Sequence, residues 1–525
     1  MKIIVGGDVA CERKERYAHG GIDLEFAKAE KIAEWLGGAE IVNDEAEETS
    51  EELAVGRVDR GYVKEFLDTL AFNQYGICRK DGKTVVAGHC TMSTALACDY
   101  LLSLAKEDVK DGFTAVLTND AWIADFIEPD ATLVSATDCC FDNFEVVYSA
   151  SKEVYVKYIA DLKANGYELG FSNEICGNLF NRFKKGSTFL SASYSPSEEY
   201  IRVISGSLDK NKFVDVLKTG DEDISEVTVT QMTLDYISGS FGMCYIITLK
   251  DGSFAIFDGG HVRVVNGYPK TYDYVRLYTL LKELNKRPDG KIVISAWFMT
   301  HEHADHFNVF YWFCKQYGSE VTLKAYCACP CSNAVAYNAQ NPEYHTVNGQ
   351  LKEALESVGG ADVVTLQTGD KFSLCDVDFE IIFTIDDRCP KRLRRFNDCS
   401  FVSKMTYNGQ AIMWLGDAGI APSKLIRKRY TTEYLKSDIV NVAHHGYNGV
   451  EPELYDMIGA NVWLWSLYYK IVEGFLAEGA DTSLDYVQYA RKIHSMENPP
   501  RIFYHKGANY TLKLPYRGEE DLTKR

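Results

Sequence analysis

The chain has 525 residues, too many for one hydrophobic core, and this length predicts about three domains. With 46% hydrophobic, 13% aromatic and 25% charged residues, the composition is that of a folded globular protein and excludes a disordered or fibrous chain. The net charge of −19 repels phosphate polymers overall, so nucleic acid is not an expected partner.

The amino terminus and the cysteines bear on the cellular compartment. The first residues, MKIIVGGDVACERK, have one lysine and a short apolar run followed by charges, so they lack the apolar core of a secretion signal. No segment has the length and apolarity of a membrane span. We therefore expect the 15 cysteines to be reduced thiols and the protein to be cytoplasmic, with no membrane partner.

A small α/β domain is predicted for residues 1–142. Residues 2–5 form an apolar strand, residues 22–36 have helical spacing, and short strands are expected at 54–58 and 84–87. Three segments weakly resemble the accessory domain of α-glucuronidases and related glycosidases: GRVDR, DGKTVVAGH and TALACDYLLSLA. The resemblance implies a scaffold that accompanies carbohydrate-active modules and implies no catalysis here.

Residues 143–225 are predicted to form a small α+β domain that ends in a linker. A strand at 144–149 precedes a helix at 152–166, whose single apolar face can cover a sheet. Three further strands are expected at 173–184, 187–195 and 199–206. The charged span 208–226 indicates the linker. We find no residues suited to chemistry in this domain and assign it a packing or lid role.

The third domain is predicted to cover residues 226–525. Its strands and one helix alternate with polar turns. The expected strands are 227–236, 242–249, 253–258, 292–299, a run ending at 414, and 439–443, with a helix at 272–284. Two of these strands end in runs of histidine and aspartate, and the third domain is therefore the candidate catalytic module.

The segment HEHADH at residues 301–306 directly follows the buried strand at 292–299, so it lies on a loop at the carboxyl end of that strand. It offers four metal ligands, His301, His303, Asp305 and His306. The first two can bind one metal while the last two turn to a second, as in two-metal hydrolases. Imidazole and carboxylate ligands favour zinc, with manganese or iron as alternatives.

With later motifs, this loop resembles the metallo-β-lactamase superfamily. The superfamily pattern has an early acidic turn, H-x-H-x-D-H, a later histidine, a bridging aspartate and a final histidine. Asp258 in FDGG, Asp417 in WLGD and the pair His444-His445 before Gly446 match the acidic turn and the last two parts. The resemblance implies a C-terminal αββα sandwich with two divalent metal ions, in which Asp417 bridges the metals and Asp258 supports the ligand loop from behind.

The later histidine of the pattern is missing. At its place the sequence reads FNDCSFV, residues 396–402. Asn397, Asp398 or a water could supply the third ligand of the first metal, and His345 is a lesser candidate. We therefore expect the metal bound by His301 and His303 to be the weaker of the two.

The adjacent histidines leave two assignments open. Either His444 or His445 ligates the second metal with Asp305 and His306, and the other faces the substrate, where an imidazole can bind an oxygen or protonate a leaving group. Asp305, His444 and His445 are therefore the candidate catalytic residues.

Three short motifs resemble one branch of the superfamily, which includes DNA-uptake competence proteins and phosphorylcholine esterases. The motifs are Asn-x-x-Ser before a strand, Leu-Gly-Asp, and Val-x-His-His-Gly. The resemblance implies a phosphodiesterase-like metallohydrolase acting on a small-molecule or cell-wall-derived substrate. Two alternatives stay open: an acyl hydrolase for thioesters, lactones or lactams, and a non-catalytic binding protein with a relic metal site.

Overall fold

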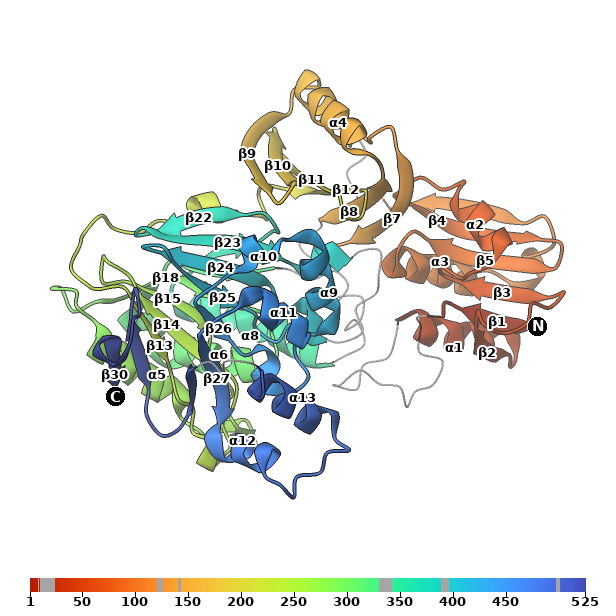
Figure 1. Cartoon of the computed structure of the whole chain (residues 1–525). Coiled ribbons are helices and arrows are strands. Elements are labelled where there is room, and N and C mark those ends of the chain that lie inside the picture. The colour runs from red at the N-terminus through yellow and green to blue at the C-terminus, as the bar shows by residue number, and fades with distance from the viewer. Residues whose placement is uncertain are drawn as a thin grey trace.

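The computed structural model shows three units along the chain, coloured red, orange to yellow, and green to blue in Figure 1. The described residues are 1–7, 9, 24–119, 126–139, 143–329, 342–388, 396–496 and 501–525, with the backbone alone described at 138 and 342–348. Within these ranges no helix is both long enough and apolar enough to cross a membrane.

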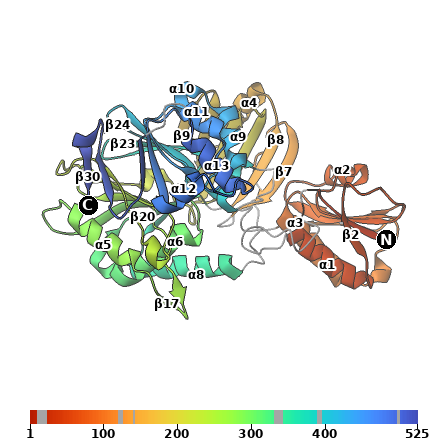
Figure 2. The same cartoon turned by 60° about the horizontal axis from the view of Figure 1, so that its bottom comes forward.

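The first unit is a mixed sheet covered by helices on both faces (Figure 2). In spatial order its strands are β2 (Glu40–Asn43), β1 (Lys2–Val5), β3 (Glu52–Val55), β5 (Lys83–Gly88), β4 (Gln74–Lys80) and β6 (Thr114–Thr118). Helices α1 (Leu24–Leu36) and α3 (Thr91–Ser103) pack on the face of Ile3, and α2 (Gly61–Leu67) packs on the face of Ile4. Side chains alternate along a strand, so β1 supplies both cores. This is the predicted α/β architecture.

The second unit is an antiparallel sheet with one covering helix, α4 (Lys152–Ala164). Its strands in spatial order are β7 (Thr132–Asp138), β8 (Phe144–Ser149), β12 (Tyr200–Ser207), β11 (Thr188–Ser195), β10 (Asn178–Lys185) and β9 (Glu168–Ile175). The single strand predicted at 173–184 is wrong, because Cys176 and Gly177 have positive φ and form a two-residue hairpin turn between β9 and β10. β7 pairs with β8, so this sheet begins ahead of residue 143.

The predicted linker, residues 208–226, is packed onto the third unit. Lys212 pairs with Val364 in a parallel bridge, and the Thr365 amide donates to the Lys212 carbonyl at 2.8 Å. Val214 is buried in the core of the third unit. The charges of this span face outward while its apolar residues anchor it, so composition alone did not predict the packing.

Two sheets form the third unit. The first contains β21 (Asp362–Thr365), β20 (Ala325–Ala328), β18 (Ile292–Phe298), β15 (Phe254–Asp258), β14 (Cys244–Thr248), β13 (Thr228–Gln231), β29 (Tyr510–Lys513) and β30 (Leu522–Lys524), with β19 (Val321–Leu323) also paired to β18. The second contains β22 (Lys371–Leu374), β23 (Val377–Phe383), β24 (Val402–Tyr407), β25 (Gln410–Trp414), β26 (Ile439–Asn441), β27 (Val462–Tyr468) and β28 (Arg501–His505). A hairpin of β16 (Val264–Val265) and β17 (Tyr268–Pro269) follows β15.

The two sheets face each other across an apolar core, and helices cover their outer faces. Phe257 of the first sheet stacks on Trp414 of the second, with ring centroids 4.8 Å apart. Helices α5 (Asp273–Leu284), α6 (Ala304–Tyr317) and α8 (Pro342–Ser357) lie outside the first sheet. Outside the second lie α9 (Ile420–Arg429), α10 (Thr432–Leu435), α11 (Pro452–Ile458), α12 (Tyr469–Leu476) and α13 (Asp485–His494). The layers are therefore αββα, as predicted.

Candidate metal centre

Polar side chains from both sheets meet at one edge of the sandwich. β15 and β18 run parallel, so Asp258 at the end of β15 and the 301–306 loop after β18 emerge on the same side. β25 and β26 are also parallel, which brings Asp417 and His445 together on the facing sheet. β18 is buried along its whole length, so polar ligands begin only where the strand ends.

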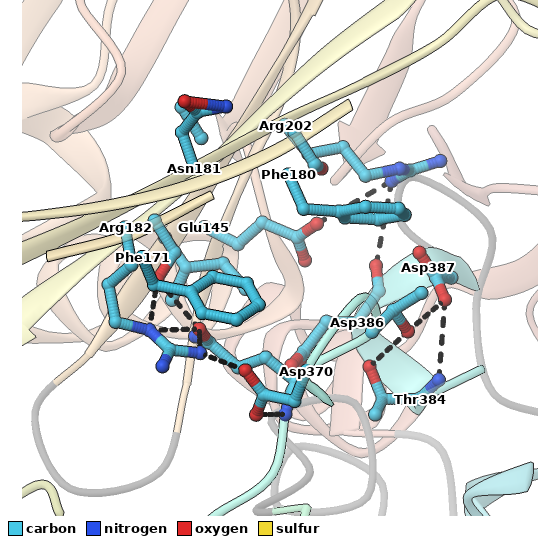
Figure 3. Close-up of a pocket in the computed structure, with 16 residues that line it drawn as sticks. Glu145, Phe171, Phe180, Asn181, Arg182, Arg202, Asp370, Thr384, Asp386 and Asp387 are labelled. Atoms are coloured by element: carbon cyan, nitrogen blue, oxygen red, sulfur yellow. Dashed lines mark hydrogen bonds and ion pairs between the residues drawn. The ribbon is translucent and has the colours of Figure 1, made fainter. Parts of the chain in front are cut away.

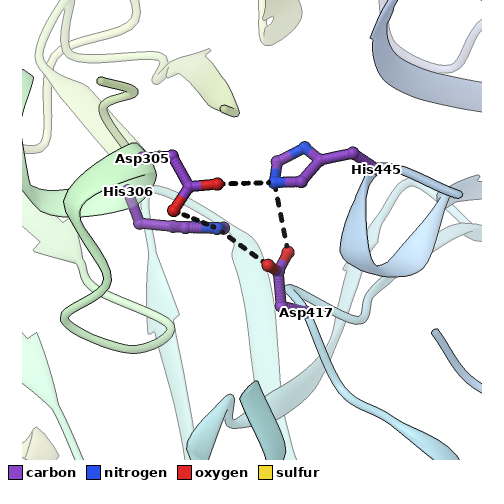
Figure 4. Close-up of side chains that lie close together, drawn as sticks. All are labelled: Asp305, His306, Asp417 and His445. Carbon is purple, nitrogen blue, oxygen red and sulfur yellow. Dashed lines mark ion pairs between the residues drawn. The ribbon is translucent and has the colours of Figure 1, made fainter. Parts of the chain in front are cut away.

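Four side chains converge at this edge: Asp305, His306, Asp417 and His445 (Figure 4). Each places one ligand atom within 4.8 Å of those of the other three. His306 Nε2 lies 3.2 Å from Asp417 Oδ2, and His445 Nε2 lies 3.2 Å from Asp305 Oδ2. We call this set the four-ligand group.

A second set, the three-ligand group, consists of His301, His303 and Asp417. His301 Nε2 lies 2.9 Å from His303 Nδ1 and 3.9 Å from Asp417 Oδ2. Asp417 belongs to both groups, so one buried carboxylate stands between them. This is the place expected of a bridging ligand.

The histidines of the four-ligand group are oriented by acceptors on their far sides. His306 Nδ1 lies 2.8 Å from Asp258 Oδ2, and the Asp258 carboxylate also accepts from the Thr300 amide at 2.8 Å and the Thr300 hydroxyl at 2.9 Å. His445 Nδ1 lies 3.2 Å from the Ser466 carbonyl. Each acceptor holds a proton on Nδ1, which leaves Nε2 to face the ligand group.

Local backbone geometry separates the two adjacent histidines. His444 and His445 have φ of 49° and 51°, the left-handed region that non-glycine residues rarely adopt. Gly446 follows with φ 83°, and a Cβ there would lie 2.6 Å from the Trp465 ring. The turn directs His445 into the four-ligand group. His444 points elsewhere: its Nε2 lies 2.7 Å from Asn397 Nδ2.

The electrostatics of the centre favour a cation at its middle. Burial lowers the pKa of His306, but the carboxylates of Asp417, Asp258 and Asp305 outweigh burial and raise this pKa well above its ordinary value. Burial and the charge of His306 hold the pKa of His301 well below its ordinary value, so His301 is neutral. The three carboxylates thus favour a positive charge on His306 in the four-ligand group. His301 keeps the neutral form of imidazole, which is the form that binds metals.

The donor atoms fit a divalent metal. Over the described ranges no hydrogen bond reaches His306 Nε2, His445 Nε2 or Asp417 Oδ1, although all three atoms are buried. Buried polar atoms are almost always paired. Because these nitrogen and oxygen atoms have no hydrogen bond and converge on one point, they can coordinate a cation such as zinc.

Residues 396–402, where the superfamily pattern has its later histidine, take other roles. Asn397 is bound to His444, and Asp398 is in neither ligand group. Ser400, which the sequence did not single out, has its Oγ 3.2 Å from His301 Nδ1 and accepts from the Asp417 amide at 3.1 Å. The Asn-x-x-Ser motif is the feature of the sequence that could have identified Ser400 as a site residue. The side chain of His345 lies outside the described residues.

No protein-family model and no curated protein matches the sequence. Solved structures match it in part. The metallo-β-lactamase fold protein YhfI from Bacillus subtilis matches 55% of this chain and 100% of its own, at 12% identity and TM-score 0.31. The diiron β-hydroxylase CmlA from Streptomyces venezuelae matches 55% of each chain, at 12% identity and TM-score 0.30. Human tRNase Z, short form, matches 45% of this chain and 90% of its own, at 11% identity and TM-score 0.28.

Similarity at these values carries no argument about activity, so the fold is assigned from the chain itself. Two facing sheets lie between helical layers, the ligand loop follows the buried strand β18, and Asp417 reaches the same edge from the second sheet. The C-terminal domain therefore has the αββα layers and the ligand loop that the resemblance in the sequence implied.

Proposed function

We propose that this protein is a metal-dependent hydrolase that binds two divalent cations, zinc by preference, and cleaves phosphoesters. The observation that carries the proposal is the pair of ligand groups that share Asp417 at one edge of the sandwich. When bound, two such cations supply a nucleophilic water at neutral pH and stabilise developing negative charge. The four-ligand group would hold one cation, and His301 and His303 with Asp417 would hold the other.

Asp305 is suited to orient the attacking water. Burial raises the pKa of its carboxyl, but His306 and His445 outweigh burial and lower this pKa below its ordinary value, so the carboxylate is ionised. An ionised carboxylate accepts hydrogen bonds only. We assign Asp305 the role of acceptor for a proton of the nucleophile, in addition to its place in the four-ligand group.

His444 is suited to contact the substrate. Burial lowers the pKa of His444, so its imidazole is neutral. The Asn397 amide donates to Nε2 at 2.7 Å, and the single proton of the neutral ring is then on Nδ1. An N–H held in this way can donate to a phosphoryl oxygen or to the leaving group.

Charge supports an anionic substrate of small size. Two dications carry four positive charges, and the two carboxylates of the ligand groups, Asp305 and Asp417, offset two of them. The remaining charge attracts a phosphoryl group, while the net charge of −19 opposes a long polyanion. The three branch motifs also support a phosphoester over an acyl substrate.

A substrate panel with defined metal content tests the proposal. Protein stripped of metal and reloaded with zinc, manganese or ferrous iron is assayed on phosphomonoesters, phosphodiesters, a thioester and a lactone. We expect metal-dependent phosphoester turnover that is absent in Asp417→Ala and intact in Asp376→Ala, an exposed acid paired with Lys250. Acyl turnover alone would establish the acyl hydrolase instead. No turnover, together with a metal content that Asp417→Ala does not lower, would indicate a relic site, because a two-metal centre needs its ions.

A further inference from the structure

A separate set of potential metal ligands lies where the second unit meets the third. Cys139 follows β7, Glu145 lies in β8, and Asp386 lies in the short helix η6 (Ile385–Arg388) after β23. The three residues place one ligand atom each within 4.8 Å of one another. Because Asp386 is more than 200 residues from the other two, only the packing of the two units creates this cluster.

Two carboxylate oxygens in the cluster are buried without a hydrogen bond. Glu145 has no exposed surface, and its Oε1 lies 3.5 Å from Arg202 Nη1. Across the described part of the chain, Glu145 Oε2 and Asp386 Oδ1 have no hydrogen-bond partner. A fully buried carboxylate oxygen without a donor is rare in folded proteins, and it indicates an unfilled binding requirement.

A network of ion pairs lies beside the cluster. In Figure 3 the Glu145 and Arg202 side chains extend from the sheet of the second unit toward Asp386 and Asp387, which lie in η6 of the third unit. Arg202 pairs with Glu145 at 3.5 Å and Glu198 at 3.2 Å. Arg429 pairs with Glu198 and with Asp387, both at 2.5 Å.

A cavity lies beside the two carboxylates, and a second thiol lies beside Asp386. Glu145 and Asp386 line a cavity of about 40 Å³, more than the roughly 10–15 Å³ that one water requires. Cys329, at the end of β20, has its Sγ 3.6 Å from Asp386 Oδ2. A cation between Glu145 and Asp386 would therefore have the Cys139 thiol available as a sulfur ligand.

We propose that Cys139, Glu145 and Asp386 bind a zinc ion that joins the sheet of the second unit to the third unit. A thiolate together with two carboxylates suits zinc, whereas calcium and magnesium prefer oxygen ligands alone. The ligands come from both units, so the ion cross-links them. This site is independent of the two ligand groups at the sandwich edge, which contain no sulfur.

Cobalt substitution of the full-length protein tests the site without a mutation. Metal-free protein kept under reducing conditions is titrated with Co²⁺ and followed by absorption. We expect a thiolate-to-cobalt charge-transfer band in the near ultraviolet, with one cobalt per chain responsible for it. The ligand groups at the sandwich edge offer only nitrogen and oxygen, so they cannot produce this band. Absence of the band from the full-length protein would overturn the proposal, and it is the outcome expected if protons neutralise the carboxylates.

Variants assign the band to these residues. Cys139→Ser and Glu145→Gln should lower zinc content by one ion per chain, and Cys139→Ser should weaken the cobalt band. Cys176→Ser, at an exposed cysteine, is the matched control and should change neither. Asp417→Ala should keep the band while it loses hydrolysis, so failure of the hydrolase proposal and failure of this site are distinguishable. A band that persists unchanged in Cys139→Ser contradicts the assignment.

Discussion

The two ligand groups of the metal centre share Asp417 but differ in how completely the chain builds them. The four-ligand group has two histidines, each oriented from behind by Asp258 or by the Ser466 carbonyl. The three-ligand group has two histidines and Asp417, and Ser400 lies behind His301. Among the described residues the first group has four protein ligands, as many as a tetrahedral zinc site uses, and the second has three.

The difference arises in a short segment, residues 396–400. Where the superfamily pattern has a histidine, Asn397 instead fixes His444, and the Phe396 ring lies 4.9 Å from the ring of His303. The segment thus exchanges a metal ligand for contacts that position neighbouring imidazoles. We infer that the four-ligand group anchors one metal firmly and that the three-ligand group binds the metal that exchanges.

Asp417→Ala should have the largest effect, since it removes the one ligand that both groups use. We expect turnover to fall by about 10³-fold or more, the magnitude typical for loss of a main electrostatic contributor. Metal analysis of the variant should show less than the wild-type content in both groups. Turnover within tenfold of wild type would show that Asp417 does not join the two groups.

Stepwise removal of metal should reveal the difference in metal affinity between the two ligand groups. In a chelator titration we expect the two ions of the metal centre to leave in two steps, in addition to any loss of the zinc proposed at Cys139, Glu145 and Asp386. The first step should come from the three-ligand group and should be accompanied by loss of activity. His303→Ala should lack the first step and keep the second, whereas His306→Ala should lose the tighter metal. Loss of both metals together at one chelator concentration would contradict the inferred difference in affinity.

Asp258→Asn should weaken the four-ligand group without removing a ligand. The neutral amide no longer stabilises the N–H of His306, so we expect a decrease of about 10- to 100-fold in metal affinity or activity. Equilibrium dialysis with zinc measures the affinity. The affinity of the three-ligand group should change less, and an equal decrease in both would point to a general loss of structure.

Asn397→Ala should have the smallest effect, because it removes one hydrogen bond to a residue outside both groups. A loss of about 1 kcal/mol corresponds to roughly fivefold in turnover. We expect metal content to stay at the wild-type value while kcat falls. If the variant instead loses metal from the three-ligand group, Asn397 belongs among its ligands.

Local patterns predicted most of the elements near the site. The uninterrupted apolar run of β18 indicated a strand buried on both faces, and the spacing of the 301–306 loop indicated ligands for two metals. Prediction from the sequence was less accurate where only a few residues determine the course of the backbone. The hairpin at Cys176 and Gly177 divided a predicted strand, and the charged span 208–226 lies on the third unit through a few apolar contacts.

By itself the sequence located the buried strand β18 and the His/Asp loop that follows it, because periodic burial and ligand spacing are local properties of the chain. The αββα layers were what the resemblance to a known superfamily implied. Only the tertiary structure decided which adjacent histidine enters the four-ligand group, since two left-handed residues before Gly446 send their side chains in different directions. It also decided that Cys139 and Glu145 meet Asp386. Contacts between distant segments depend on how whole units pack, and no local pattern contains that information.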